Sequence, residues 1–191
     1  IAHIAKYKTS VYDIYGFSSD SIIAKTGFDN MSLFKEVCSY FTHTGNSSDI
    51  IKAIYKDCKK NVLSVPYHID AECQVEGSYL INLYRALKIF ELLYSTSFKK
   101  DDIDPDLVYS LIFLRNFYIV SGYEKKIVYT LNEESLDRGA INVFHDYLKS
   151  YKKLVSKKYF SKLERCLFDS SSTSLEEGVV SEIFRLVEYA D

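Results

Sequence analysis

DPDLVYSLIFLRNFYIVSG, residues 104–122, is the stretch of sequence that decides the fold. It opens with Asp104 and Pro105, which combine an N-cap residue with a proline at the first helical position. The residues that follow, as far as Ser121, are apolar on nearly every side of a helical projection. Because a helix without a polar face is buried, we expect a helix over 105–121 at the centre of the molecule.

Apolar residues at helical spacing predict that other helices surround this one. The stripe over 78–95 predicts a long helix, which we expect to pair antiparallel with 105–121 as a central hairpin. N-caps are expected at Asp29 or Asn30 and at Ser47 or Ser48, and a capping box begins at Ser174. The remaining stripes run over 33–41, 50–62, 141–155, 159–167 and 179–187.

Three segments are less clearly patterned. The pattern of residues 1–28 predicts two weak helices. The dozen or so residues from Pro66 to Gly77 are predicted to form a loop that is long enough to be functional. Residues 123–131 fit either a helix or a strand, and 169–174 fit a loop.

The composition favours an all-α domain. With 7 Gly and 2 Pro in 191 residues, the chain lacks the turn residues that a β-sandwich or barrel needs. A hydrophobic fraction of 47% and a net charge of -2 exclude a disordered chain and a strongly basic nucleic-acid binder. We expect residues 1–191 to form a single all-α domain, an irregular helical bundle of roughly eight to ten helices around a central hydrophobic helical hairpin. Because the chain begins at Ile1, we expect it to be a fragment or a processed form of a larger protein.

The sequence contains no motif that predicts a catalytic, cofactor or metal site. Its 4 Cys form no C-x-x-C pair, and Cys58, His68 and Cys73 are better interpreted as buried thiols and a loop histidine than as zinc ligands. No glycine-rich phosphate loop or nucleophile elbow occurs. We therefore expect no enzyme activity, no metal and no cofactor.

Acidic residues at alternate positions precede the central helix. Asp102, Asp104 and Asp106 alternate like the start of an EF-hand loop, but Leu107 stands where that loop needs glycine and Phe113 where it needs glutamate. These acids are therefore predicted to stabilise the positive N-terminus of a helix.

Arg115 and Asn116 interrupt the apolar run and are predicted to be buried polar residues with a structural role. A buried guanidinium needs a charged or hydrogen-bonded partner, such as Glu91. The triplet around Arg115 resembles the Arg half of the catalytic motif of HEPN-type ribonucleases. That motif places a His a few residues later, where this chain has residues 120–122, Val-Ser-Gly, so the sequence argues against a nuclease.

One stretch is strongly charged. Residues 149–165 contain seven basic residues and one acid, whereas 166–191 contain six acids and one Arg. On a helical projection Lys149, Lys152, Lys153 and Lys157 face away from the apolar stripe, so the basic stretch is a candidate for contacting a partner or phosphates. A solvated face without a partner is the alternative interpretation. The candidate contacts are Lys149, Lys152, Lys153, Lys157, Lys158, Lys162 and Arg165.

These observations favour a non-enzymatic intracellular protein–protein interaction module, or a subunit of a larger assembly, that binds through helix faces or a groove. The 17 Tyr support this hypothesis, since tyrosine is common at interfaces. The alternative is a nucleic-acid-binding helical domain that uses 149–165, and a ribonuclease with a degenerate site is a third hypothesis. The free thiols predict a reducing compartment, cytoplasm or nucleus, and no stretch predicts a membrane span.

Overall fold

A computed structural model describes residues 29–66, 77–96, 103–124 and 133–168, together with 178–180, 182, 183 and 185. All regular structure in these residues is helical, and no strand occurs among them. The expected helices in 1–28, most of the loop after Pro66, most of the ambiguous segment 123–131 and the capping box at Ser174 lie outside them. The all-α prediction is therefore confirmed for the described residues.

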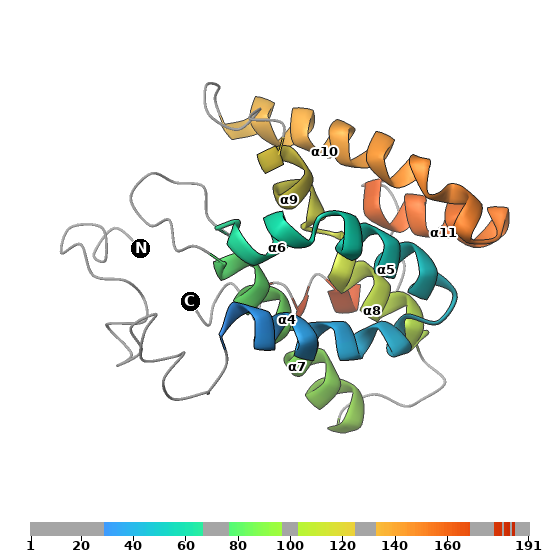
Figure 1. The fold of residues 1–191 in the computed structure, drawn as a ribbon. Coiled ribbons are helices and arrows are strands. Elements are labelled where there is room, and N and C mark those ends of the chain that lie inside the picture. The colour runs from blue at the N-terminus through green and yellow to red at the C-terminus, as the bar shows by residue number, and fades with distance from the viewer. Residues whose placement is uncertain are drawn as a thin grey trace.

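The helices follow one another with short connections, and Figure 1 shows how they are arranged. They are α4 (Asn30–Ser39), η1 (Tyr40–Ser47), α5 (Ser48–Asp57), α6 (Lys59–Ser64), α7 (Ser78–Thr96), α8 (Pro105–Leu114), α9 (Phe117–Glu124), α10 (Glu133–Ser150), η3 (Lys152–Leu154) and α11 (Lys157–Phe168).

Two helix starts form as the sequence predicts. The Asp29 carboxylate accepts a hydrogen bond from the backbone N–H of Ser32 at 2.6 Å. The Asp104 carboxylate accepts one from the N–H of Leu107 at 3.3 Å, with Pro105 in the first helical position. Each bond satisfies an N–H group that the first turn of a helix leaves without a partner.

Helix α8 is buried along nearly its whole length. Every side chain from Leu107 to Leu114 is buried. It packs most extensively against η1 and also contacts α5, α7, α9 and α11. Aromatic pairs mark these contacts: the Phe113 ring lies 5.2 Å from that of Phe41, and Tyr109 meets Phe90 of α7 edge to face at 4.8 Å. The prediction that this segment lies deep in the core is confirmed.

The single helix expected over 105–121 is two helices. Helix α8 ends at Leu114, Arg115 and Asn116 form a turn, and α9 continues past Gly122 to Glu124. The N–H of Arg115 still bonds to Leu111 O at 2.8 Å, and Asn116 O accepts from the N–H of Ile119 at 3.1 Å. Because both helices bury their apolar residues, the apolar run does not reveal the break.

Two other expected helices are also interrupted. The stripe over 50–62 is divided at Cys58, where α5 ends and α6 begins. The stripe over 141–155 ends earlier than expected, since α10 stops at Ser150 and a short 3₁₀ helix follows. Beyond the first break Val62 is buried, and beyond the second Val155 is half-buried against the core.

The buried apolar side chains form one cluster that runs from Leu33 of α4 to Ile183. None of the helices described here is both long enough and apolar enough to cross a membrane.

Candidate functional site

Arg115 and Asn116 do not lie inside a buried helix. Arg115 is exposed and Asn116 is half-buried, because the turn between α8 and α9 carries both out of the core. The prediction that Arg115 is a buried polar residue is therefore wrong. Instead, both residues line a cavity of about 230 Å³ beside α10 and α11.

Glu91, the acid suggested from the sequence as a partner of Arg115, has two other partners. It accepts hydrogen bonds from the ammonium of Lys88 at 3.0 Å and from the Tyr40 hydroxyl at 2.8 Å. These two bonds, that from Lys88 first, lower the pKa of the Glu91 carboxyl. Glu91 thus links α7 to η1.

The basic stretch forms a corner rather than one helical face. Helix α10 ends at Ser150, η3 makes the bend, and α11 begins at Lys157 (Figure 1). Five of the predicted contact residues lie on this bend, and all five are exposed. We call them the basic corner: Lys149, Lys152, Lys153, Lys157 and Lys158.

A chain of polar contacts fixes the corner to the rest of the molecule. The Tyr151 hydroxyl donates to Asp57 at the end of α5, at 2.6 Å, and lies 2.8 Å from the Tyr147 hydroxyl. The Tyr147 hydroxyl in turn lies 3.2 Å from Cys58 Sγ. Burial, followed by the bond to Asp57, raises the pKa of Tyr151 to about 12. The bend is therefore held on α5 by neutral tyrosines.

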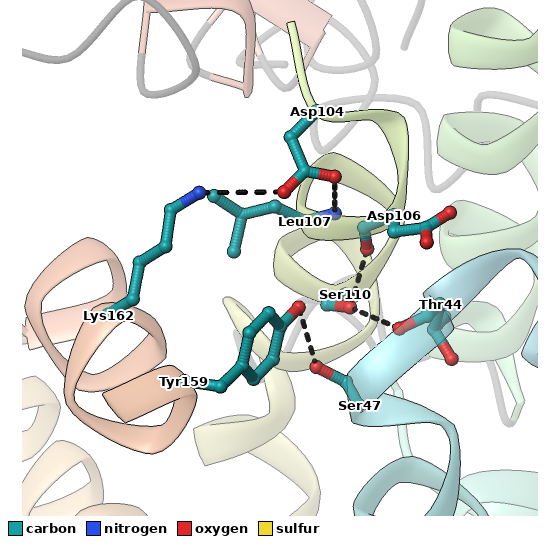
Figure 2. Close-up of polar contacts among 8 residues, drawn as sticks. All are labelled: Thr44, Ser47, Asp104, Asp106, Leu107, Ser110, Tyr159 and Lys162. Atoms are coloured by element: carbon teal, nitrogen blue, oxygen red, sulfur yellow. Dashed lines mark hydrogen bonds and ion pairs between the residues drawn. The ribbon is translucent and has the colours of Figure 1, made fainter. Parts of the chain in front are cut away.

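The other two predicted contact residues are separate from the corner. Lys162 forms an ion pair with Asp104 at 3.5 Å, and beside it the Tyr159 hydroxyl lies 3.1 Å from Ser47 Oγ (Figure 2). These contacts link α11 to the N-cap of α8 and to the end of η1, so the Lys162 ammonium is engaged within the molecule. Arg165 is exposed farther along α11.

Asp104 and Asp106, at the start of α8, do not converge, and Asp102 lies outside the described residues. Figure 2 shows the Asp104 carboxylate turned toward Lys162, whereas the Asp106 side chain points away from it. No group of three or more His, Cys, Asp or Glu side chains suitable for a metal occurs in the described part of the chain. Cys38, Cys58 and Cys166 are free thiols; Cys58 is buried and the other two are half-buried.

Sequence reasoning missed further basic residues next to the corner. Lys52 and Lys56 are exposed on α5, the helix whose last residue, Asp57, bonds to Tyr151. Because η3 also packs against α5, positive charge from two segments far apart in sequence lies on neighbouring elements. Lysines near the end of a helix stabilise its negative C-terminus. Their position at the end of α5 therefore did not indicate a binding surface.

Leu154 lies within the basic corner and is 46% exposed. It belongs to η3, between Lys153 and the start of α11. Tyr151 and Tyr159, the aromatic residues of this region, are half-buried, and their hydroxyls are bonded to Asp57 and Ser47. The corner therefore combines exposed lysines with one exposed aliphatic side chain in the same stretch of the chain.

Comparison of the chain with protein-family models, with curated proteins and with solved structures finds no match.

Proposed function

We propose that this chain is a non-enzymatic, intracellular interaction module that binds an acidic protein surface through the basic corner. The observation that supports the proposal is the presence of five exposed lysines on one bend that also carries the exposed Leu154. In the part of the chain that the structure describes, none of the five forms an ion pair. Their charge is therefore available to carboxylates of a partner.

A protein partner is favoured over a nucleic acid by the aromatic residues of the region. Single-stranded nucleic acids are bound by stacking bases on exposed aromatic rings. Here Tyr151 and Tyr159 are half-buried and tied by their hydroxyls, whereas the exposed apolar side chain is an aliphatic one. An aliphatic contact surrounded by cations is suited to a protein surface with acids around an apolar residue.

The alternative of nucleic-acid binding is supported by the extent of positive charge, since α5 adds Lys52 and Lys56 beside the corner. A backbone of phosphates needs charge but no apolar contact. The two hypotheses therefore differ in the role that they give to Leu154.

For the scaffold of this module we propose roughly eight to ten helices around a central helical hairpin. The contact of Phe90 with Tyr109 supports a pairing of α7 with α8. In this arrangement the hairpin anchors the core, and the corner between α10 and α11 lies at its periphery (Figure 1).

The test is a pull-down from native cell extract with three variants and with or without nuclease. One variant replaces all five corner lysines by Gln. A second is Leu154→Ser, and a matched control is Lys35→Gln with Lys60→Gln, two lysines that are also exposed. We expect nuclease-resistant capture of a protein by the wild type and the control. The five-lysine variant and Leu154→Ser should each lose most of it, by about tenfold or more.

Capture that disappears after nuclease treatment and is unaffected by Leu154→Ser would support the nucleic-acid alternative. Undiminished capture by the five-lysine variant would contradict both hypotheses.

A further inference from the structure

The stretch that carries the basic corner contains one sequence pattern twice. Residues 152–157 are Lys-Lys-Leu-Val-Ser-Lys, and residues 157–162 are Lys-Lys-Tyr-Phe-Ser-Lys. In each copy a serine, Ser156 or Ser161, has lysines three and four positions before it and another lysine directly after it. Basic residues around a serine favour recognition by a kinase with an acidic substrate groove, because complementary charge selects the partner. The sequence alone does not distinguish the two serines.

The structure places Ser156 where an enzyme can reach it. Ser156 belongs to no helix, and it lies exposed between η3 and α11. The backbone of Val155, just before it, is extended, with φ -135° and ψ 165°. The Ser156 hydroxyl oxygen accepts a hydrogen bond from the N–H of Tyr159 at 3.3 Å, and this bond does not use the hydroxyl proton.

Ser161 is exposed as well, but it lies inside α11. The side chains of Phe160 and Leu163, before and after it, are buried in the core. A kinase must bring the acceptor hydroxyl in line with the γ-phosphate of ATP, beside the aspartate that takes its proton. Ser161 can reach that position only if this part of α11 leaves the core. Ser156 requires no more than opening of the exposed start of the helix, where helices fray.

We propose that Ser156 is phosphorylated by a serine kinase that selects basic substrates, and that the phosphate weakens binding by the basic corner. In this reaction Ser156 Oγ forms a bond to the γ-phosphorus of ATP, while the bond from that phosphorus to the β–γ bridging oxygen breaks. ADP leaves with the bonding electrons, and the hydroxyl proton passes to the catalytic aspartate of the kinase. ATP is the co-reactant.

The phosphate would change the charge of the basic corner. Phosphoserine carries a charge of about -1.5 to -2 at pH 7, so it would offset about two of the five positive charges. Its oxygens would accept hydrogen bonds from ammonium groups that otherwise are available to carboxylates of a partner. This loss of binding rests on the proposed function, whereas the modification of Ser156 does not.

The test of the site treats the folded full chain with Mg·ATP and the catalytic domain of protein kinase C, a kinase that selects serines between basic residues. Mass spectrometry locates the phosphate. We expect Ser156 to be phosphorylated at least about tenfold faster than Ser161, since opening a packed part of a helix costs more free energy than opening its exposed end. Ser161→Ala is the matched control and should be phosphorylated as fast as the wild type.

Further variants test the roles of the hydroxyl and of the lysines. Ser156→Ala should lose most of the phosphate, and Ser156→Thr, which keeps the hydroxyl, should regain it at the same position. The five-lysine variant keeps Ser156 and should be phosphorylated at least about tenfold more slowly, whereas the Lys35→Gln and Lys60→Gln control should react as the wild type does. Equal or faster phosphorylation of Ser161, no phosphate on the folded chain, or undiminished phosphorylation of the five-lysine variant would each overturn the site.

The pull-down proposed for the basic corner tests the effect on binding. Chain phosphorylated at Ser156 should capture about tenfold less protein than the unmodified chain, and a phosphatase should restore the capture. Undiminished capture by the phosphorylated chain, together with loss of capture by the five-lysine variant, would overturn the regulation and leave the proposed function standing. Undiminished capture by the five-lysine variant would contradict the proposed function, and the mass spectrum would still decide whether Ser156 is modified.

Discussion

The abundance of tyrosine has a structural explanation at the level of single residues. The Tyr55 hydroxyl, fully buried, donates to the carbonyl of Phe113 at 2.9 Å and lies 3.1 Å from the Tyr79 hydroxyl. Tyr147 and Tyr151 bridge α10 to α5 and to Cys58. A buried hydroxyl needs such a partner, and these tyrosines provide it to one another. Tyrosine content is therefore weaker support for an interface than the sequence suggested.

Asp104 is the single residue whose role the sequence predicted most completely. It caps α8 and pairs with Lys162, although both side chains are substantially exposed. Asp104→Ala should lower the free energy of unfolding by about 1 kcal/mol, through loss of the cap. Lys162→Met, which removes the ion pair and leaves the cap in place, should change it by less than about 0.5 kcal/mol because exposed pairs contribute little. Urea unfolding followed by circular dichroism measures both, and equal losses would show that the ion pair, not the cap, is the stabilising contact.

At the level of elements, the sequence predicted where helices begin better than where they end or bend. Asp29 and Asp104 act through bonds to N–H groups within three residues, so a local pattern is enough to identify them. The breaks at Cys58 and at Arg115 leave apolar side chains buried on both sides. Only packing against other helices decides that the chain turns there, and a periodicity argument does not include that packing.

Gly45 interrupts the regular helical conformation of η1. It lies in η1 with φ 46° and ψ -119°, a conformation that residues with a side chain rarely adopt. A Cβ at this position would collide with the carboxylate of Asp106 on α8. Gly45 is thus a kink within η1, because its φ and ψ are not helical while the residues on either side of it are.

Gly45→Ala should therefore destabilise the protein on two separable grounds. The backbone conformation alone should cost about 1 to 3 kcal/mol in a residue with a Cβ, and the collision with Asp106 should add to it. The double variant with Asp106→Ala removes the carboxylate, which makes the closest contacts of the collision, and should recover part of the loss. Unfolding free energies of the four members of this cycle test the argument. Additive effects would mean that Asp106 moves away without cost.

At the scale of the whole molecule, the sequence predicted which stretch is strongly charged, but not how the fold arranges those charges in space. The sequence predicted seven candidate contact residues, four of them on one helical face, whereas the fold gathers five at a bend, pairs Lys162 with Asp104 and brings α5 alongside. The cavity beside Arg115 was not predicted, because it is built from the α8–α9 turn and from two helices much later in the chain. Sites of this kind depend on contacts between segments that are distant in sequence, and a single sequence contains no direct record of them.

The buried tyrosines also predict how the whole fold responds to alkaline pH. Burial raises the pKa of Tyr109 and of Tyr151 to about 12, and it raises that of Tyr55 well above its ordinary value. In the unfolded chain these phenols titrate near about 10. Since the unfolded state loses its protons first, the stabilisation is fully present below about pH 10 and is lost as the pH rises toward about 12.

The urea midpoint measured by circular dichroism should accordingly remain nearly level from about pH 8 to 9.5 and then fall steeply up to about pH 12. Tyr109→Phe removes one of these titrating groups and should make the fall shallower. If the midpoint stayed level across this range, or fell identically in Tyr109→Phe, the buried phenols would not be the groups that couple the fold to pH.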